Sequence, residues 1–159
     1  MEPIYKFLRE NRYELSGVAI CIALALISTT IYFQEVYDLY DTLKQSFNVK
    51  PYSAYIVPLC IGFYCLLGFT VGKMIKLQSE TRAIIIGIIV IVINMAWTPI
   101  FFVSEDIDIA FFWISLLLVM TIIFTNLIRK DKLLFYLTIP YLLWVIINWL
   151  VNLNLLILY

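Results

Sequence analysis

Three side chains at helical spacing, near the end of a long apolar stretch, are the first candidates for a site in this chain. The stretch runs from Ala83 to Ser104 without a charged residue and contains Asn94, Trp97 and Phe101. Residues at i, i+3 and i+7 share one face of a helix. An amide without a partner in hydrocarbon is costly, so Asn94 must face protein, a cavity or a ligand. A hydrogen bond to a neighbouring helix is the alternative explanation of this residue.

A second polar and aromatic stripe lies in the last apolar stretch of the chain. Pro140, Trp144, Asn148 and Asn152 follow one another at i+4 steps, with Tyr141 beside them. Polar side chains of a lipid-embedded helix face the interior of the bundle. Hydrogen bonds between helices would account for the two asparagines, but they leave Trp144 less well explained.

The composition excludes several classes of chemistry. The chain is 64% apolar and 14% charged, far from a soluble protein, and its net charge of zero gives no reason to expect nucleic acid as a partner. It has no histidine, the commonest metal ligand and general base, and its three cysteines lie in apolar runs without metal-ligand spacing. No charged residue interrupts the apolar runs, which disfavours an ion-driven pump. We therefore expect no catalytic residues and no metal.

Five apolar runs without a charge predict the fold. They cover approximately residues 15–34, 51–72, 83–104, 109–128 and 133–157. Each is about the 20 residues that a helix needs to cross a bilayer, and backbone in lipid must be helical when barrel alternation is missing. We expect a single all-α integral membrane domain over residues 1–159, a bundle of five transmembrane helices.

The distribution of basic residues predicts the orientation. Nine of the eleven Lys and Arg residues lie in the N-terminal segment and in the second–third and fourth–fifth loops, and the other two lie in the first loop, Glu35 to Lys50. The positive-inside rule places the N-terminus inside and the C-terminus outside. A prokaryotic cell membrane fits this pattern, and a mitochondrial outer membrane is the alternative. Residues 1–14 could form a short interfacial helix, and the long first loop could be a binding loop or a solvated linker.

The motifs in the third and fifth runs resemble those of a known family. Asn94-x-x-Trp97-x-x-x-Phe101-Phe102, together with Pro140-Tyr141-Leu142-x-Trp144 followed by Asn152, is similar to the TspO/MBR family, the translocator protein or tryptophan-rich sensory protein family. Tyr40-x-x-Leu43-Lys44 in the first loop and Tyr64-x-x-x-Gly68 in the second run are further similarities.

This resemblance implies a five-helix bundle, usually a homodimer, with a pocket that opens toward the first loop. In the family the pocket binds porphyrins and related tetrapyrroles, sterols and synthetic compounds. Carried over by position, the residues that line it here are Asn94, Trp97, Phe101, Trp144 and Tyr64. Asn148 is added from helix geometry alone. No covalent cofactor is implied, and a haem-like tetrapyrrole is a candidate ligand.

The chain also departs from the family. By our alignment Cys60 stands where the family has a second-span tryptophan, Trp113 stands where it has an acidic residue, and only four tryptophans remain. Some members degrade porphyrin in light with tryptophans implicated, and the missing tryptophans disfavour this activity here. The leading hypothesis is a receptor or translocator for a flat hydrophobic ligand, with membrane lipid as its surroundings. A porphyrin-degrading enzyme and a purely structural or sensory membrane protein are the alternatives.

Overall fold

The computed structural model describes the backbone of residues 2–31, 53–104 and 106–158, and the side chains of residues 4–27, 59–97, 99–100 and 106–157. The first loop, interpreted above as a binding loop or a solvated linker, lies outside these ranges. All regular structure in the described ranges is helical. The helices are α1 (Glu2–Glu10), α2 (Arg12–Ile31), α4 (Ser53–Lys76), α5 (Thr81–Ser104), α6 (Ile107–Ile128) and α7 (Lys132–Leu158).

Three of these helices are long and apolar enough to cross a membrane. They contain the segments Leu59–Lys76, Ile107–Ile128 and Lys132–Ile157, and Thr81–Trp97 is a shorter apolar helix by the same measure. The part of the chain that the structure describes is thus all-helical and has the character of a membrane protein. The count of five spans stays a prediction.

Aspartate side chains define where two of the long helices begin. Asp106 caps α6 by accepting a hydrogen bond from the Ile109 N–H at 3.1 Å. Asp131 precedes α7 and accepts from the Leu133 and Leu134 N–H groups at 3.0 and 3.2 Å. Each carboxylate satisfies backbone donors that have no partner inside the helix. The charges that end the apolar runs therefore also start the helices.

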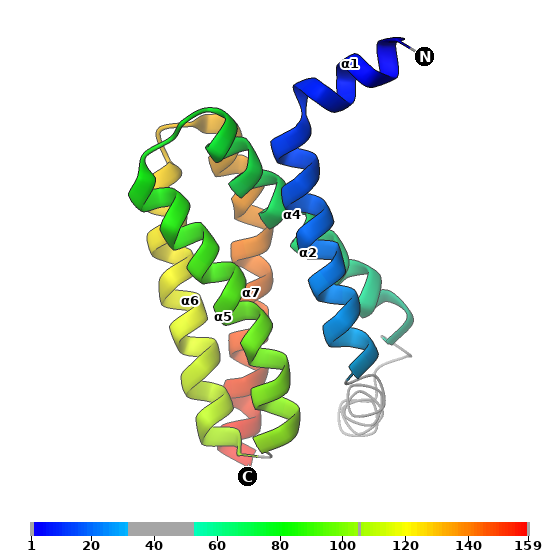
Figure 1. Ribbon diagram of the computed structural model, residues 1–159. Coiled ribbons are helices and arrows are strands. Elements are labelled where there is room, and N and C mark those ends of the chain that lie inside the picture. Colours follow the sequence, from blue (N-terminus) through cyan, green and yellow to red (C-terminus); the bar gives the residue numbers. More distant parts are fainter. Residues whose placement is uncertain (1, 32–52, 105, 159) are drawn as a thin grey trace.

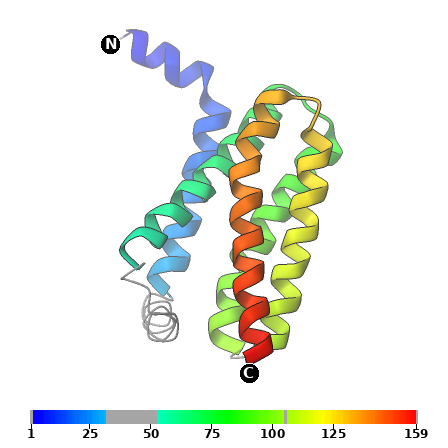
Figure 2. The same ribbon diagram turned by 180° about the vertical axis from the view of Figure 1, so that it is seen from behind.

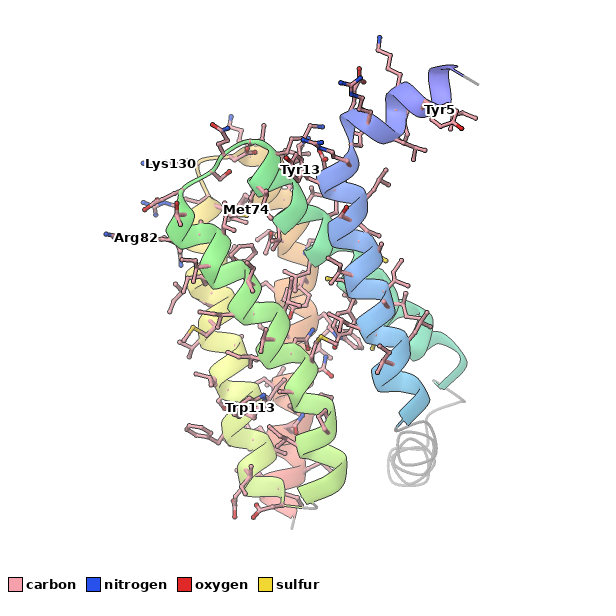
Figure 3. The ribbon with its side chains drawn as sticks, viewed as in Figure 1. Tyr5, Tyr13, Met74, Arg82, Trp113 and Lys130 are labelled. Atoms are coloured by element: carbon pink, nitrogen blue, oxygen red, sulfur yellow. The ribbon has the colours of Figure 1, made fainter. Side chains whose placement is uncertain are left out.

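The helices form two groups, which meet mainly through α4 and also where α2 touches α5. In one group α2 packs along α4, and in the other α6 lies between α5 and α7, while α4 also touches α5 and α7. Figures 1 and 2 show that the groups meet where α4 ends and diverge toward the end where α7 finishes. The two ends of the chain lie at opposite ends of the bundle, and Figure 3 shows Tyr13, Arg82 and Lys130 gathered at the end nearer α1. We call this end the basic end.

Small residues allow α2 and α4 to approach closely. Gly68 and Gly72 form a Gly-x-x-x-Gly pattern on α4, and a Cβ atom at Gly68 would overlap the backbone of Gly17 on α2. A Cβ atom at Gly72 would overlap the backbone of Tyr13 and Glu14. In a membrane, where lipid is as apolar as a leucine side chain, such close backbone packing is a main source of helix association.

The other group is held by ordinary apolar packing. Buried residues on α6 recur at four- and three-residue steps, which places them on one face of the helix. These residues are Ala110, Ile114, Leu117, Thr121, Phe124 and Ile128. Gly87 on α5 packs against the Phe124 ring, and a Cβ atom there would lie 2.8 Å from it. This packing keeps α5 and α7 on either side of α6.

One turn residue has an unfavourable backbone conformation. Gln78, between α4 and α5, has φ of 51°, and the next N–H, of Ser79, bonds to the Met74 carbonyl at 3.0 Å. This is the left-handed helix end that glycine usually occupies, because a side chain costs about 1 kcal/mol or more there.

We expect Gln78→Gly to raise the unfolding free energy by about 1 kcal/mol in a thermal melt in detergent. Ser79→Gly is the control, and an equal gain there would contradict the explanation.

Candidate functional site

Asn94 and Trp97 continue the buried face of α5. The buried residues Ala83, Gly87 and Val90 follow four- and three-residue steps, and positions 94, 97 and 101 extend the same line. Asn94 and Trp97 are half-buried, and Trp97 packs against the apolar core. Phe101 lies in α5, but its side chain is outside the described ranges. Two of the three residues in the predicted α5 motif therefore lie on an inward line.

Asn148 and Asn152 continue the buried face of α7 in the same way. Thr138, Tyr141 and Val145 are buried, and positions 148 and 152 are the next steps of the line. Asn152 is only 3% exposed, whereas Asn148 is half-buried. The i+4 spacing placed Asn152 in the polar stripe but gave no reason to assign it to the site. The structure shows that Asn152 is more deeply buried than Asn94 or Asn148.

Contacts of two tryptophans align the three helices along the bundle axis. The indole N–H of Trp113 on α6 donates to the Ile93 carbonyl on α5 at 2.9 Å. The indole N–H of Trp149 on α7 donates to the Ser115 hydroxyl on α6 at 2.9 Å, and its ring lies 5.8 Å from the Phe111 ring. These contacts bring Ile93 and Trp149 to similar heights along α6. They also account for Trp113 and Trp149 as packing residues.

This alignment brings the amides of α5 and α7 close together in height. Both helices run antiparallel to α6, so they are parallel to each other (Figure 1). By this register, Asn94 lies within about one helical turn of both Asn148 and Asn152 along the axis. We call these three residues the amide layer. Trp97 follows Asn94 by about one turn, toward the end where α7 finishes.

Trp144 and Tyr64 belong to a second layer, nearer the basic end. The Trp144 ring stacks on Phe63 of α4, with centroids 5.2 Å apart and 21° between the planes. Trp144 precedes Asn148 by one turn, or about 6 Å along α7. Tyr64 follows Phe63 in α4 and is half-buried, so it lies at the same level. We call Phe63, Tyr64 and Trp144 the aromatic layer.

The predicted site residues are therefore not all brought to one place. Asn94 and Asn148 lie at similar heights, on two helices that pack on α6 rather than on each other, and Trp97 lies about one turn from Asn94. Trp144 and Tyr64 lie in the aromatic layer. Phe63 is not among the predicted site residues, because nothing in one sequence tells which α4 residue meets Trp144.

The amides do not join helices to one another within the described side chains. Asn148 Nδ2 donates to the Trp144 carbonyl and Asn152 Nδ2 donates to the Asn148 carbonyl, each at 2.8 Å and each within α7. Asn152 Oδ1 is buried and accepts no hydrogen bond from the described residues. The Asn94 amide likewise makes none with them. Among the described side chains, the hydrogen bonds of the α7 amides therefore stay within one helix.

Threonine hydroxyl groups in the spans are satisfied locally. Thr121 donates to the Leu117 carbonyl and Thr138 to the Leu134 carbonyl, at 2.8 and 2.9 Å. The Tyr141 hydroxyl is buried near Thr121 but makes no hydrogen bond of ordinary geometry with the described residues. Bonds to the carbonyl four residues earlier are a usual arrangement of threonine in a membrane helix. Asn152 Oδ1, which is buried and accepts no hydrogen bond from the described residues, differs in this respect from the threonine hydroxyls.

The chemistry available in these layers is that of binding. The chain has no histidine, and no three His, Cys, Asp or Glu side chains lie together in the described ranges. The layers offer indole and phenyl faces, amide oxygens and a phenol. These groups can stack on a flat ring and accept hydrogen bonds from it.

The chain was compared with curated proteins, with solved structures and with models of protein families. No curated protein and no solved structure matches the chain. The model of the TspO/MBR family matches residues 17–158, nearly the whole chain. Such a match favours a ligand-binding or translocator role in a membrane. The chain belongs to the TspO/MBR family.

Proposed function

We propose that this protein binds a flat hydrophobic ligand, a tetrapyrrole or a sterol-like lipid, against the inward faces of α5 and α7. The observation that carries the proposal is the amide layer. Its three asparagines form no hydrogen bond from one helix to another among the described side chains. Amides that lie in an apolar bundle and do not link its helices by hydrogen bonds can instead orient a ligand by hydrogen bonding.

The surroundings of the amides fit an apolar ligand. Ligand sites are mostly apolar, with a few polar groups that fix orientation. Trp97 packs against the core beside the amide layer, and the Phe63–Trp144 stack provides a second aromatic surface nearer the basic end. One face of Trp144 is already covered by Phe63. A ligand ring therefore meets the other face or the edge of this indole.

Replacement of Asn152 by leucine tests the proposal. We expect the affinity for protoporphyrin IX, measured by quenching of tryptophan fluorescence, to fall about fivefold, because one hydrogen bond contributes about 1 kcal/mol. The melting temperature should stay the same or rise, since leucine removes a buried oxygen that lacks a partner among the described residues. A fluorescent sterol measured in the same way distinguishes the two ligand classes.

Asn154→Leu is the matched control, because Asn154 lies on the same helix but is exposed. Equal affinities in the two variants would contradict the proposed site. If Asn152→Leu fails to fold, Asn94→Leu provides the same comparison on α5. A variant that loses stability and keeps its affinity would support the structural alternative instead.

A further inference from the structure

The first helix is amphipathic and its apolar side chains contact little of the described protein. Ile4, Tyr5, Phe7 and Leu8 are between 47% and 69% exposed. At 100° per residue they occupy an arc of about 160°, and the opposite arc carries charged side chains. Those residues are Lys6, Arg9 and Glu10. Such an apolar face needs a covering that the described chain does not provide.

The junction after α1 holds the helix in place relative to α4. Asn11 Nδ2 donates to the Phe7 carbonyl of α1 at 3.0 Å. Asn11 Oδ1 accepts from Lys76 Nζ at 3.3 Å, and the same ammonium group donates to Glu14 at 2.9 Å. One asparagine therefore links the last turn of α1 to the end of α4. Backbone bonds from Asn11 N–H to Phe7 and from Leu15 N–H to Asn11 also cross this junction, at 3.1 and 3.0 Å.

The position of α1 identifies what covers it. It extends from the basic end of the bundle. Figure 3 shows Tyr5 on the lower side of α1 in that view. The charge-free run of α2 begins at Leu15, so α1 directly precedes a segment that the sequence predicts to enter the membrane. The sequence segments at the basic end contain nine basic and five acidic residues, whereas the rest of the chain has two basic and six acidic residues. The basic end thus complements an anionic lipid surface.

We propose that α1 lies in the headgroup region of the membrane at the basic end, with its apolar arc in the acyl boundary and anionic phospholipid around its basic residues. The positive-inside rule assigns this face to the inner leaflet. Helices of this kind lie in the interface with the apolar face buried. The site is independent of the proposed ligand site, and α1 lies outside the family-matched residues 17–158.

An environment-sensitive fluorophore on a single added cysteine tests this proposal in the full-length protein. The label is placed at Leu8→Cys on the apolar arc or at Glu10→Cys on the charged arc, with the protein lacking an added cysteine as the blank. In vesicles of phosphatidylcholine and phosphatidylglycerol, we expect the Leu8 label to shift to the blue and to be quenched by lipid nitroxides. The Glu10 label should remain in water. Equal exposure of the two labels would overturn the proposal.

A second measurement tests whether α1 requires anionic lipid. Removal of charge in Lys6→Gln and Arg9→Gln should lower the ratio of inserted to exposed Leu8 label by about fivefold for each charge, because a basic residue near an anionic surface contributes about 1 kcal/mol. Arg82→Gln, at the same end but outside α1, is the control. Insertion that is equally strong in pure phosphatidylcholine would overturn the anionic-lipid assignment.

Discussion

Replacing Gly68 with leucine is expected to separate α2 from α4 and to abolish the stable fold in detergent. A Cβ atom at Gly68 would overlap the backbone of Gly17, and the Cys21 sulfur would lie 2.8 Å away. Backbone cannot rotate aside as a flexible side chain does, so the helices must move apart. Overpacking of a core already costs about 1–3 kcal/mol when side chains can adjust. The measurement is thermal unfolding followed by circular dichroism.

Gly62 on the same helix is the matched control. A Cβ atom at Gly62 meets nothing within 4 Å, and the residue is exposed. Alanine at an exposed helical position is favoured over glycine by about 1 kcal/mol. Gly62→Ala should therefore raise the melting temperature while Gly68→Ala lowers it. Equal effects of the two substitutions would show that the close approach of α2 and α4 does not limit stability.

The helices could be predicted from the sequence because charged residues bound them. The fourth apolar run was expected at about residues 109–128, and α6 spans Ile107–Ile128. Its start is set by the capping carboxylate of Asp106 and its end by the basic residues that follow. Local chemistry of this kind can be read from one chain. The residues that share the inward faces of α5 and α7 could also be predicted, since helical spacing alone determines which residues share a face.

The partners of these residues could not be predicted from spacing. The stack of Phe63 on Trp144 and the similar heights of Ile93 and Trp149 depend on how one helix is shifted along another. A shift of one turn moves a side chain by about 5.4 Å without changing any pattern in the sequence. The division of the candidate site into an amide layer and an aromatic layer is a consequence of this shift.

Glu14 is a residue whose burial the sequence did not indicate. It precedes the first apolar run and was expected at the membrane surface, but its side chain is only 2% exposed in the first turn of α2. Its backbone packs closely against Gly72 of α4. Glu14 Oε1 lies 2.9 Å from Lys76 Nζ and 4.0 Å from Lys73 Nζ, while Oε2 is buried without a hydrogen bond to the described residues.

Replacing Glu14 with glutamine is expected to destabilise the protein by about 1–2 kcal/mol at neutral pH. Breaking a fully buried ion pair costs about 3–5 kcal/mol, but Lys76 is one-third exposed, so water screens part of the interaction. The amide keeps the shape of the carboxylate and loses its charge. Thermal unfolding in detergent measures the difference, and Glu10→Gln, on the exposed face of α1, is the matched control.

The stability difference between wild type and Glu14→Gln should also depend on pH. Burial raises the pKa of Glu14, but the hydrogen bond and charge of Lys76 and the charge of Lys73 outweigh it, so the pKa lies below its ordinary value of 4.5. A lowered pKa means that the carboxylate contributes stability above pH 4.5 and loses it as the pH falls through the folded-state value. The stability difference between wild type and Glu14→Gln should therefore shrink on acidification. This comparison removes the contributions of other carboxylates, such as the capping Asp106 and Asp131. A difference that stays constant from neutral pH to below the folded-state pKa would show that the charge of Glu14 does not hold α2 against α4.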